Sequence, residues 1–179
     1  MNVINARAAP KRTITVVQGN YAVSDDPDVV LSTVLGSCVA VCLYDPVAAI
    51  GGMNHFLLAS QGDTKSNDLK YGVNAMELLI NKVLQAGGDR RRLQAKLFGG
   101  ARMTDHSRDI GQNNAKFALD FIGREGIPCA SQSLGGDKAR RVQFSPSTGA
   151  ARQMQIAGPA PEVEVVRRAP PPAADITLF

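Results

Sequence analysis

The stretch LSTVLGSCVAVCLYDPVAAIGGMNHF, residues 31–56, determines most of what can be predicted about the fold of this chain. It is rich in apolar and β-branched residues, which favour strands. Near its middle lies Asp45-Pro46, a turn signal, because a proline cannot sit in a central strand. The stretch therefore predicts a β-hairpin. It also holds two of the three cysteines and one of the two histidines of the chain.

The register of this hairpin decides which side chains meet. If the loop consists of residues 45–48, Cys38 lies directly across from His55 on the neighbouring strand. Opposed side chains in an antiparallel pair have Cβ atoms about 4.5–5.5 Å apart. A bulge at Gly51-Gly52 is the alternative, and it would turn the histidine to the other face. The expected register places a thiol beside an imidazole.

A thiol beside an imidazole has the composition of a nucleophile with its base. A free thiol titrates near pH ~8.5, and a neighbouring imidazolium stabilises the thiolate. A third polar group commonly orients the imidazole, and Ser32, Thr33 and Ser37 are close enough in sequence to supply it. Gly36 would let a substrate approach the backbone.

The same residues also allow a structural interpretation. A cysteine in an apolar strand is usually a small buried hydrophobe, and we expect this of Cys42 and Cys129. A zinc site is disfavoured because no second ligand pair accompanies the first cysteines and histidine. His106 is expected in a loop. The pattern alone leaves catalysis and a structural role for Cys38 and His55 equally open.

Composition limits the class of protein. The chain has 179 residues, of which 44% are hydrophobic, and this suits one globular domain. Neither a secretory signal nor a membrane-spanning run is present, so the cytoplasm is the expected location, without direct membrane insertion. The net charge of +4 comes from scattered cations with few aromatic residues, which does not indicate a nucleic-acid partner. The run Arg90-Arg91-Arg92 is interpreted as a solvated connection.

Three regions are expected along the chain: a flexible arm at 1–12, a catalytic domain at 13–157, and an extended tail at 158–179. The tail contains five of the ten prolines and cannot continue a helix or a central strand. Its apolar end either docks on a partner or frays.

Hydrophobic periodicity predicts two helices between groups of strands. The helices are 74–88 and 113–126, the second capped by Asn113 or Asn114. Residues 63–72 are polar and expected to form a loop. The remaining expected strands are 13–19, 92–100, 127–134, 140–145 and 151–157. The fold class is mixed α+β: a layered sandwich of largely antiparallel sheet with the helices packed outside.

Several stretches together resemble the CheD family of chemoreceptor glutamine deamidases. The first is LGSCVAVCLYDPVAAIGGMNHFLL, where the family pattern has LGSC, then DP, then a histidine. The others are KYGVNAMELLINKVLQAGG, AKLFGGARM, IGQNNAKFALDFIGREGI and LGGDKARRVQFSPSTG. They cover nearly all of residues 13–149. Their combination is specific, although each piece alone is weak.

The resemblance implies that Cys38 is the nucleophile and His55 the catalytic histidine. The third residue of the family is a threonine six positions before the cysteine. Here that position is Ser32 with Thr33 beside it, so either hydroxyl is a candidate.

The resemblance also implies a substrate-binding region, which would join Gly36 and Ser37 to a second segment. The family's GGN-x-x-R segment falls on Gly135, Gly136 and Arg140, with Asp in place of Asn at position 137. A plain turn is the simpler interpretation of this segment.

The activity implied is hydrolysis of glutamine side-chain amides in chemoreceptors through a cysteine thioester, with no metal and no cofactor. Chemoreceptor cytoplasmic domains are the implied partners, and the CheC phosphatase is a further one. Some family members also remove methyl esters. Two alternatives are an adaptor for receptors or CheC with secondary catalysis, and another class of thiol hydrolase.

Overall fold

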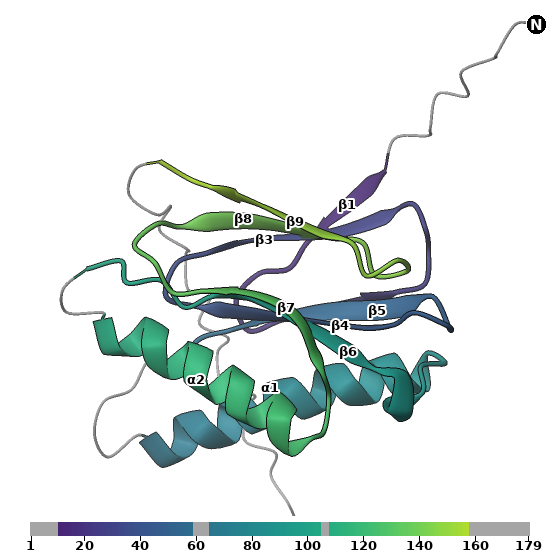
Figure 1. Cartoon of the computed structure of the whole chain (residues 1–179), viewed down its shortest axis with the longest axis horizontal. Coiled ribbons are helices and arrows are strands. Elements are labelled where there is room, and N and C mark those ends of the chain that lie inside the picture. The colour runs from purple at the N-terminus through teal and green to yellow at the C-terminus, as the bar shows by residue number, and fades with distance from the viewer. Residues whose placement is uncertain (1–10, 59–64, 105–107, 158–179) are drawn as a thin grey trace, which may run out of the picture.

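The computed structural model describes residues 11–58, 65–104 and 108–157, which form three layers (Figure 1). Two β-sheets pack face to face, and two α-helices cover the outer face of the second sheet. Neither α-helix within these residues is long and apolar enough to cross a membrane. The layered α+β class predicted from the sequence is confirmed.

The first sheet, sheet A, has the strand order β1-β3-β8-β9. Its strands are β1 (Arg12–Thr15), β3 (Val29–Leu35), β8 (Arg140–Phe144) and β9 (Ala151–Gln155). Strand β1 runs parallel to β3, and the other two pairings are antiparallel. Strand β1 thus begins at the last residue of the expected N-terminal arm. The expected tail, 158–179, lies outside the described residues.

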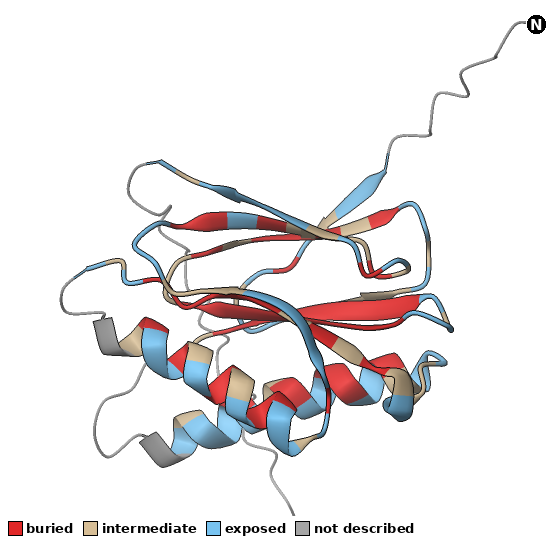
Figure 2. Cartoon of the chain, viewed as in Figure 1, coloured by how far each residue is buried: buried red, intermediate tan, exposed pale blue. Residues whose placement is uncertain are grey.

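The second sheet, sheet B, has the order β2-β5-β4-β6-β7, with only the β6–β7 pair parallel. Its strands are β2 (Tyr21–Ser24), β5 (Ile50–Phe56), β4 (Val39–Asp45), β6 (Gln94–Gly99) and β7 (Cys129–Leu134). Every residue of β4 and β5 is buried, because these strands lie between sheet A and the helices (Figure 2).

Alternation along β4 divides the core into two clusters. Val39, Val41 and Leu43 face the helices α1 (Lys65–Gln85) and α2 (Arg108–Arg124). The residues between them face sheet A and join the cluster between the sheets, which also contains Cys38. A side chain's place in the strand therefore decides whether it packs on a helix or on the other sheet.

Both helices begin earlier than the periodicity predicted. The expected loop at 63–72 is wrong in its described part, because α1 already begins at Lys65. Asn114 does not cap α2 but lies inside it, fully buried. Its amide accepts a hydrogen bond from Leu58 N at 2.7 Å and donates to Leu58 O at 3.2 Å. Tertiary contacts thus place this asparagine in the helix interior, which local propensity disfavours.

The β4–β5 hairpin has a four-residue loop, but the loop is 46–49 rather than 45–48, because Asp45 pairs with Ile50. Its carboxylate accepts from Val47 N at 2.9 Å and Ala48 N at 3.1 Å, which keeps Asp45 in the strand and closes the turn. The expectation that Cys38 directly opposes His55 is therefore wrong. The partner of His55 is Ala40, and the pairing runs without the bulge considered above.

Asp45 is also the buried member of an ion pair with the partly exposed Arg92. The 3-10 helix η1 (Arg90–Arg92) brings the Arg92 guanidinium to 2.8 Å from the Asp45 carboxylate, and Asp89 N donates to the same carboxylate at 2.8 Å. These donors hold the pKa of Asp45 well below its ordinary value. Arg91 is exposed, as the sequence predicted for the arginine run. Arg92 instead joins η1 to the β4–β5 hairpin through its ion pair with Asp45.

Candidate active site

The chain crosses from sheet A to sheet B at residues 36–38, between the end of β3 and the start of β4. This crossing places Cys38 at the end of the layer between the sheets, where it is 8% exposed. Cys38 and Ala40 both belong to the inter-sheet cluster, and Ala40 pairs with His55. The cysteine and the histidine therefore face the same layer as diagonal rather than opposed neighbours.

His55 is held from the opposite sheet by Thr33. The Thr33 hydroxyl lies 2.9 Å from His55 Nδ1 and donates to Val16 O at 2.8 Å. Because that hydroxyl has one proton and gives it to Val16 O, Nδ1 must carry the proton of the neutral imidazole. Val16 O lies 3.3 Å from Nδ1, which would be repulsive if Nδ1 were unprotonated.

The other ring nitrogen, Nε2, then carries the free lone pair. It is buried and has no hydrogen-bond partner. Burial lowers the pKa of His55, so the ring is neutral at physiological pH. An unprotonated, unpartnered nitrogen in a buried layer is available to accept a proton.

The strand geometry distinguishes Ser32 from Thr33, the two hydroxyls that the sequence left as alternatives. Ser32 and Thr33 are adjacent in β3, so their side chains point to opposite faces of sheet A. Thr33 contacts His55. Ser32, whose partner in the strand register is Gln143, therefore points to the other face of sheet A. The threonine nearer the cysteine, not the serine six positions before it, lies against the imidazole.

The Cys38 thiol is protonated at rest. Its Sγ donates a hydrogen bond to Gln18 Oε1 at 3.3 Å. Burial raises the pKa of Cys38 to about 11. Tyr71 of α1 lies close enough to the sulfur for the thiolate charge to help raise the pKa of the tyrosine, after the larger effect of burial. Cysteine and histidine are both shifted towards their neutral forms.

Backbone hydrogen bonds pin the crossing loop to the end of β6. Gly100 N donates to Cys38 O and Ala101 N donates to Gly36 O, both at 2.8 Å. Gly99 makes this approach possible, because a Cβ there would lie 2.1 Å from Cys38 O. Ser37 lies half-buried within the same loop.

The predicted substrate-binding glycines, Gly135 and Gly136, contact residues 99–102, which in turn contact the crossing loop. Gly135 N donates to Gly99 O at 2.9 Å, and Gly136 O accepts from Arg102 N at 2.8 Å. Both glycines line a shallow hollow of about 590 Å³ together with Gly100. The structure therefore brings Gly135 and Gly136 close to the crossing loop.

Arg140 does not point a free guanidinium at a substrate. It is 4% exposed and donates to Ser133 O at 2.6 Å and to Gly135 O. Its nitrogen atoms thereby hold the turn between β7 and β8, with Nε left unpaired. A buried guanidinium used in this way is a scaffold for the turn.

The other two cysteines, Cys42 and Cys129, are not part of the site. Cys42 is fully buried, as predicted, whereas the prediction of a core position for Cys129 is wrong because it is exposed. His106 lies outside the described residues. Within the described ranges, no group of three histidine, cysteine or acidic side chains is arranged to hold a metal.

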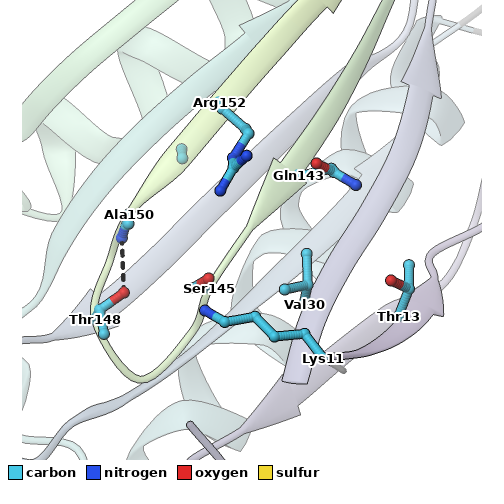
Figure 3. Close-up of a pocket in the computed structure, with 9 residues that line it drawn as sticks. Lys11, Thr13, Val30, Gln143, Ser145, Thr148, Ala150 and Arg152 are labelled. Atoms are coloured by element: carbon cyan, nitrogen blue, oxygen red, sulfur yellow. Dashed lines mark hydrogen bonds between the residues drawn. The ribbon is translucent and has the colours of Figure 1, made fainter. Parts of the chain in front are cut away.

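A separate hollow of about 280 Å³ lies on the outer face of sheet A (Figure 3). Lys11 and Arg152 reach into it beside Thr13 and Gln143, and its lining contains no carboxylate. It lies on the opposite face of sheet A from Thr33 and contains none of the residues predicted for the site.

Sequence reasoning missed three groups around the thiol and imidazole. These are the Gln18 amide, the Val16 carbonyl and the Tyr71 hydroxyl. Gln18-Gly19 carried a turn signal, a glycine after a polar residue, although the strand predicted at 13–19 included both residues. Val16 lies two residues before Gln18, whereas Tyr71 comes from helix α1, which is distant in sequence.

Comparison with known proteins identifies the family. The model for CheD, described as CheD chemotactic sensory transduction, matches residues 57–155. A relative from Ruegeria sp. (strain TM1040), named "Probable chemoreceptor glutamine deamidase CheD 1", is 49% identical, covering 93% of this chain and 95% of that protein. One from Agrobacterium fabrum, named "Probable chemoreceptor glutamine deamidase CheD", is 49% identical over 96% of this chain and 98% of its own.

A third relative with the latter name, from Caulobacter vibrioides (strain NA1000 / CB15N), is 46% identical over 95% of this chain and 96% of its own. The chain belongs to the CheD family. Among solved structures, Bacillus licheniformis hypothetical protein YfiH is 16% identical, covering 64% of this chain and 50% of that chain. Its TM-score of 0.43 is too low to support an argument about this fold.

Proposed function

We propose that this chain is a chemoreceptor glutamine deamidase, with Cys38 as nucleophile, His55 as proton carrier and Thr33 as the residue that orients His55. The observation that carries this proposal is the buried imidazole whose Nδ1 is held by Thr33 while Nε2 has no partner. Membership of the CheD family, with relatives named as deamidases, supports the substrate class.

Acylation begins from the neutral pair. Because the thiol pKa is raised to about 11 and the pKa of His55 is lowered, a preformed thiolate–imidazolium pair is not the resting state. His55 Nε2 takes the thiol proton as the sulfur attacks the side-chain amide carbon of a receptor glutamine. The tetrahedral intermediate then collapses, and Nε2–H protonates the departing ammonia. A thioester on Cys38 remains.

Deacylation uses the same nitrogen. His55 Nε2 removes a proton from water, the hydroxide attacks the thioester carbonyl, and the thiol is restored as the glutamate leaves. During both steps the imidazole becomes positively charged, and the Thr33 oxygen and Val16 O stabilise the charge at Nδ1–H. Thr33 is therefore a positioning residue that acts through His55.

The receptor glutamine is converted to glutamate, which adds a negative charge to a receptor helix. We infer that the protein works in the cytoplasm on the cytoplasmic domains of chemoreceptors, and that CheC is a further partner. The loop at Gly36–Ser37 and the hollow beside Gly135 and Gly136 would receive the receptor segment around the glutamine. The same thioester route would hydrolyse a glutamyl methyl ester.

The test is incubation of the full chain with a receptor cytoplasmic fragment, followed by peptide mass spectrometry for glutamine becoming glutamate. Wild type should convert specific glutamines, whereas Cys38→Ala should convert none. Cys129→Ala is the matched control, because Cys129 is an exposed thiol outside the site and should not affect conversion.

Each alternative function has its own outcome in this assay. Conversion that persists in Cys38→Ala would refute the mechanism. Binding of the receptor fragment without conversion by wild type would favour the adaptor function, and cleavage of the fragment backbone would indicate a peptidase.

A further inference from the structure

A glutamine side chain of the protein itself lies against the thiol. Cys38 Sγ donates to Gln18 Oε1 at 3.3 Å, so the proposed nucleophile already contacts a primary carboxamide. The group is chemically identical to the one that a glutamine deamidase must bind. None of the roles assigned above uses it.

The position of Gln18 is fixed by a tight turn. Asn20 N donates to Val17 O at 3.0 Å, and Gly19 has φ of +85°, which together describe a type II turn with Gln18 at its second position. A side chain at position 19 would be strained at this φ, so glycine is required. The turn therefore holds the backbone of Gln18 in one place.

The turn is also hydrogen-bonded to β5, the strand that carries His55. Gly19 N donates to His55 O at 2.7 Å, and His55 N donates to Asn20 O at 3.1 Å. The residue that carries the imidazole thus positions the carboxamide as well. The Gln18 side chain is half-buried, so rotation about its own torsions can carry it out to solvent while these backbone bonds stay intact.

We propose that the Gln18 side chain occupies, in the resting enzyme, the subsite that receives the carboxamide of the substrate glutamine, and that it leaves this subsite when substrate binds. This inference rests on the proposed deamidase function. A substrate carboxamide must reach the sulfur, and the space beside the sulfur holds the Gln18 carboxamide. Two carboxamides cannot occupy that space together.

The consequence is an internal competitor. When the binding-competent form of a site is only partly populated, the apparent affinity falls by that fraction. A resting hydrogen bond from Sγ also keeps the proton on sulfur until the acceptor is exchanged. Gln18 therefore reduces both receptor affinity and the reactivity of the idle thiol towards other electrophiles.

The first test is the rate of Cys38 alkylation by iodoacetamide in the full chain, resolved by peptide mass spectrometry. Exposed Cys129 serves as the reference thiol in the same sample, and buried Cys42 should stay unmodified. Gln18→Ala should raise the Cys38 rate relative to Cys129 by about fivefold, the effect of losing one hydrogen bond. Gln85→Ala, which removes an exposed amide at the end of α1, should change nothing.

A second variant separates occupancy from a loosened loop. Gln18→Glu places a charged acceptor in the same position, which opposes thiolate formation, so alkylation should become slower than in wild type. A loosened loop would accelerate both variants. Equal rates in wild type and Gln18→Ala, or acceleration in both variants, would overturn the proposal.

The second test is deamidation of the receptor fragment. Gln18→Ala should lower KM several-fold and leave kcat within about twofold, because it removes a competitor and not a group that acts in the chemical step. A raised KM would mean that Gln18 helps to hold the substrate and would overturn the proposal. If wild type converts no glutamine, the proposed function fails, while the alkylation rates still decide whether Gln18 occupies the space beside the thiol.

Discussion

The two ends of strand β4 carry buried polar groups in opposite states. At its C-terminal end, the Asp45 carboxylate accepts from two turn amides, from Asp89 N and from the Arg92 guanidinium. Just before its N-terminal end, Cys38 has a single acceptor, and the neighbouring His55 leaves Nε2 without any partner. Buried polar groups are normally satisfied, so the unsatisfied end is the one that requires a functional explanation.

The two ends of β4 also differ in the ionisation state that their surroundings favour. The donors around Asp45 favour its ionised form and lower its pKa, whereas burial at the other end favours the neutral forms of Cys38 and His55. A satisfied charge stabilises the folded state, and an unsatisfied neutral pair stays ready to transfer a proton. The same strand is therefore anchored at one end and carries the proposed reactive pair at the other.

The largest expected effect comes from removing the proton carrier. His55→Gln keeps a polar side chain of similar size but cannot act as a base, so kcat/KM for receptor deamidation should fall by about 10³-fold. Urea unfolding should show a loss of about 1–2 kcal/mol, because the contacts of Nδ1 with Thr33 and Val16 are lost, so activity is compared for the folded fraction. A loss of activity below about tenfold would contradict the role of His55 as the base.

At the other end of β4, a substitution is expected to lower stability and to leave activity nearly unchanged. Asp45→Asn removes the charge that pairs with Arg92, and the free energy of unfolding should fall by about 2–3 kcal/mol. Deamidation by the folded fraction should stay within about twofold of wild type. Asp120→Asn is the matched control, because its ion pair with Lys116 is exposed and should contribute less than about 0.5 kcal/mol.

Acid should remove this difference between wild type and Asp45→Asn. The folded-state pKa of Asp45 is depressed, so its stabilisation is complete above the unfolded pKa of about 4 and is lost as the pH falls below it. Urea unfolding near pH 3 should therefore give a smaller gap than at pH 7. A gap of the same size at both would show that the charge is not responsible.

An intermediate effect is expected from the residue behind the imidazole. Thr33→Val keeps the shape but leaves Nδ1–H without the hydroxyl acceptor, and kcat should fall by about 10–100-fold. Thr33→Ser should restore most of the activity, and Ser32→Ala should leave it within about twofold. If Ser32→Ala were the more damaging variant, the assignment of the orienting hydroxyl would be reversed.

The smallest change is expected from pH in the neutral and mildly alkaline range. With the pKa of His55 below its ordinary value and that of Cys38 near 11, the reactive neutral pair persists between these limits. The kcat/KM should vary by less than about twofold between pH 7 and 9, and should fall only at a pH below the ordinary imidazole pKa of about 6.5, because the pKa of His55 is lowered. A tenfold rise between pH 7 and 8 would instead indicate that the reactive thiolate forms by losing its proton to solvent, without His55 as the base.

Most of the fold was accessible from local pattern. The hairpin formed by β4 and β5, the strands at both ends and the cores of both helices carry their own apolar periodicity. Residues 31–35 of the stretch expected to form the hairpin instead belong to β3 of sheet A. The α1 residues before 74 were not accessible, because those described are mostly exposed and show no apolar period. The interior position of Asn114 was not accessible either, because its bonds to Leu58 override local propensity. Strand β2 has only four half-buried residues, too few for a period to stand out.

The composition of the site was accessible in the same way, but its geometry was not. The sequence placed Cys38 and His55 on paired strands, and the family resemblance gave them roles. The register was displaced because Asp45 closes the turn from within the strand. The shift moves His55 from a position opposite Cys38 to one opposite Ala40, two residues further along the strand. Because side chains alternate with period two, His55 stays on the same face as Cys38.

What the sequence by itself determined is the hairpin, the layered class of fold and membership of the CheD family, and it supplied the proposed thiol and imidazole. What only the tertiary structure decided is which groups surround them. Thr33, Val16 and Gln18 reach the site from outside the hairpin or across the interface between the sheets. Such contacts depend on how two sheets pack, and no periodicity within one segment encodes the position of another segment.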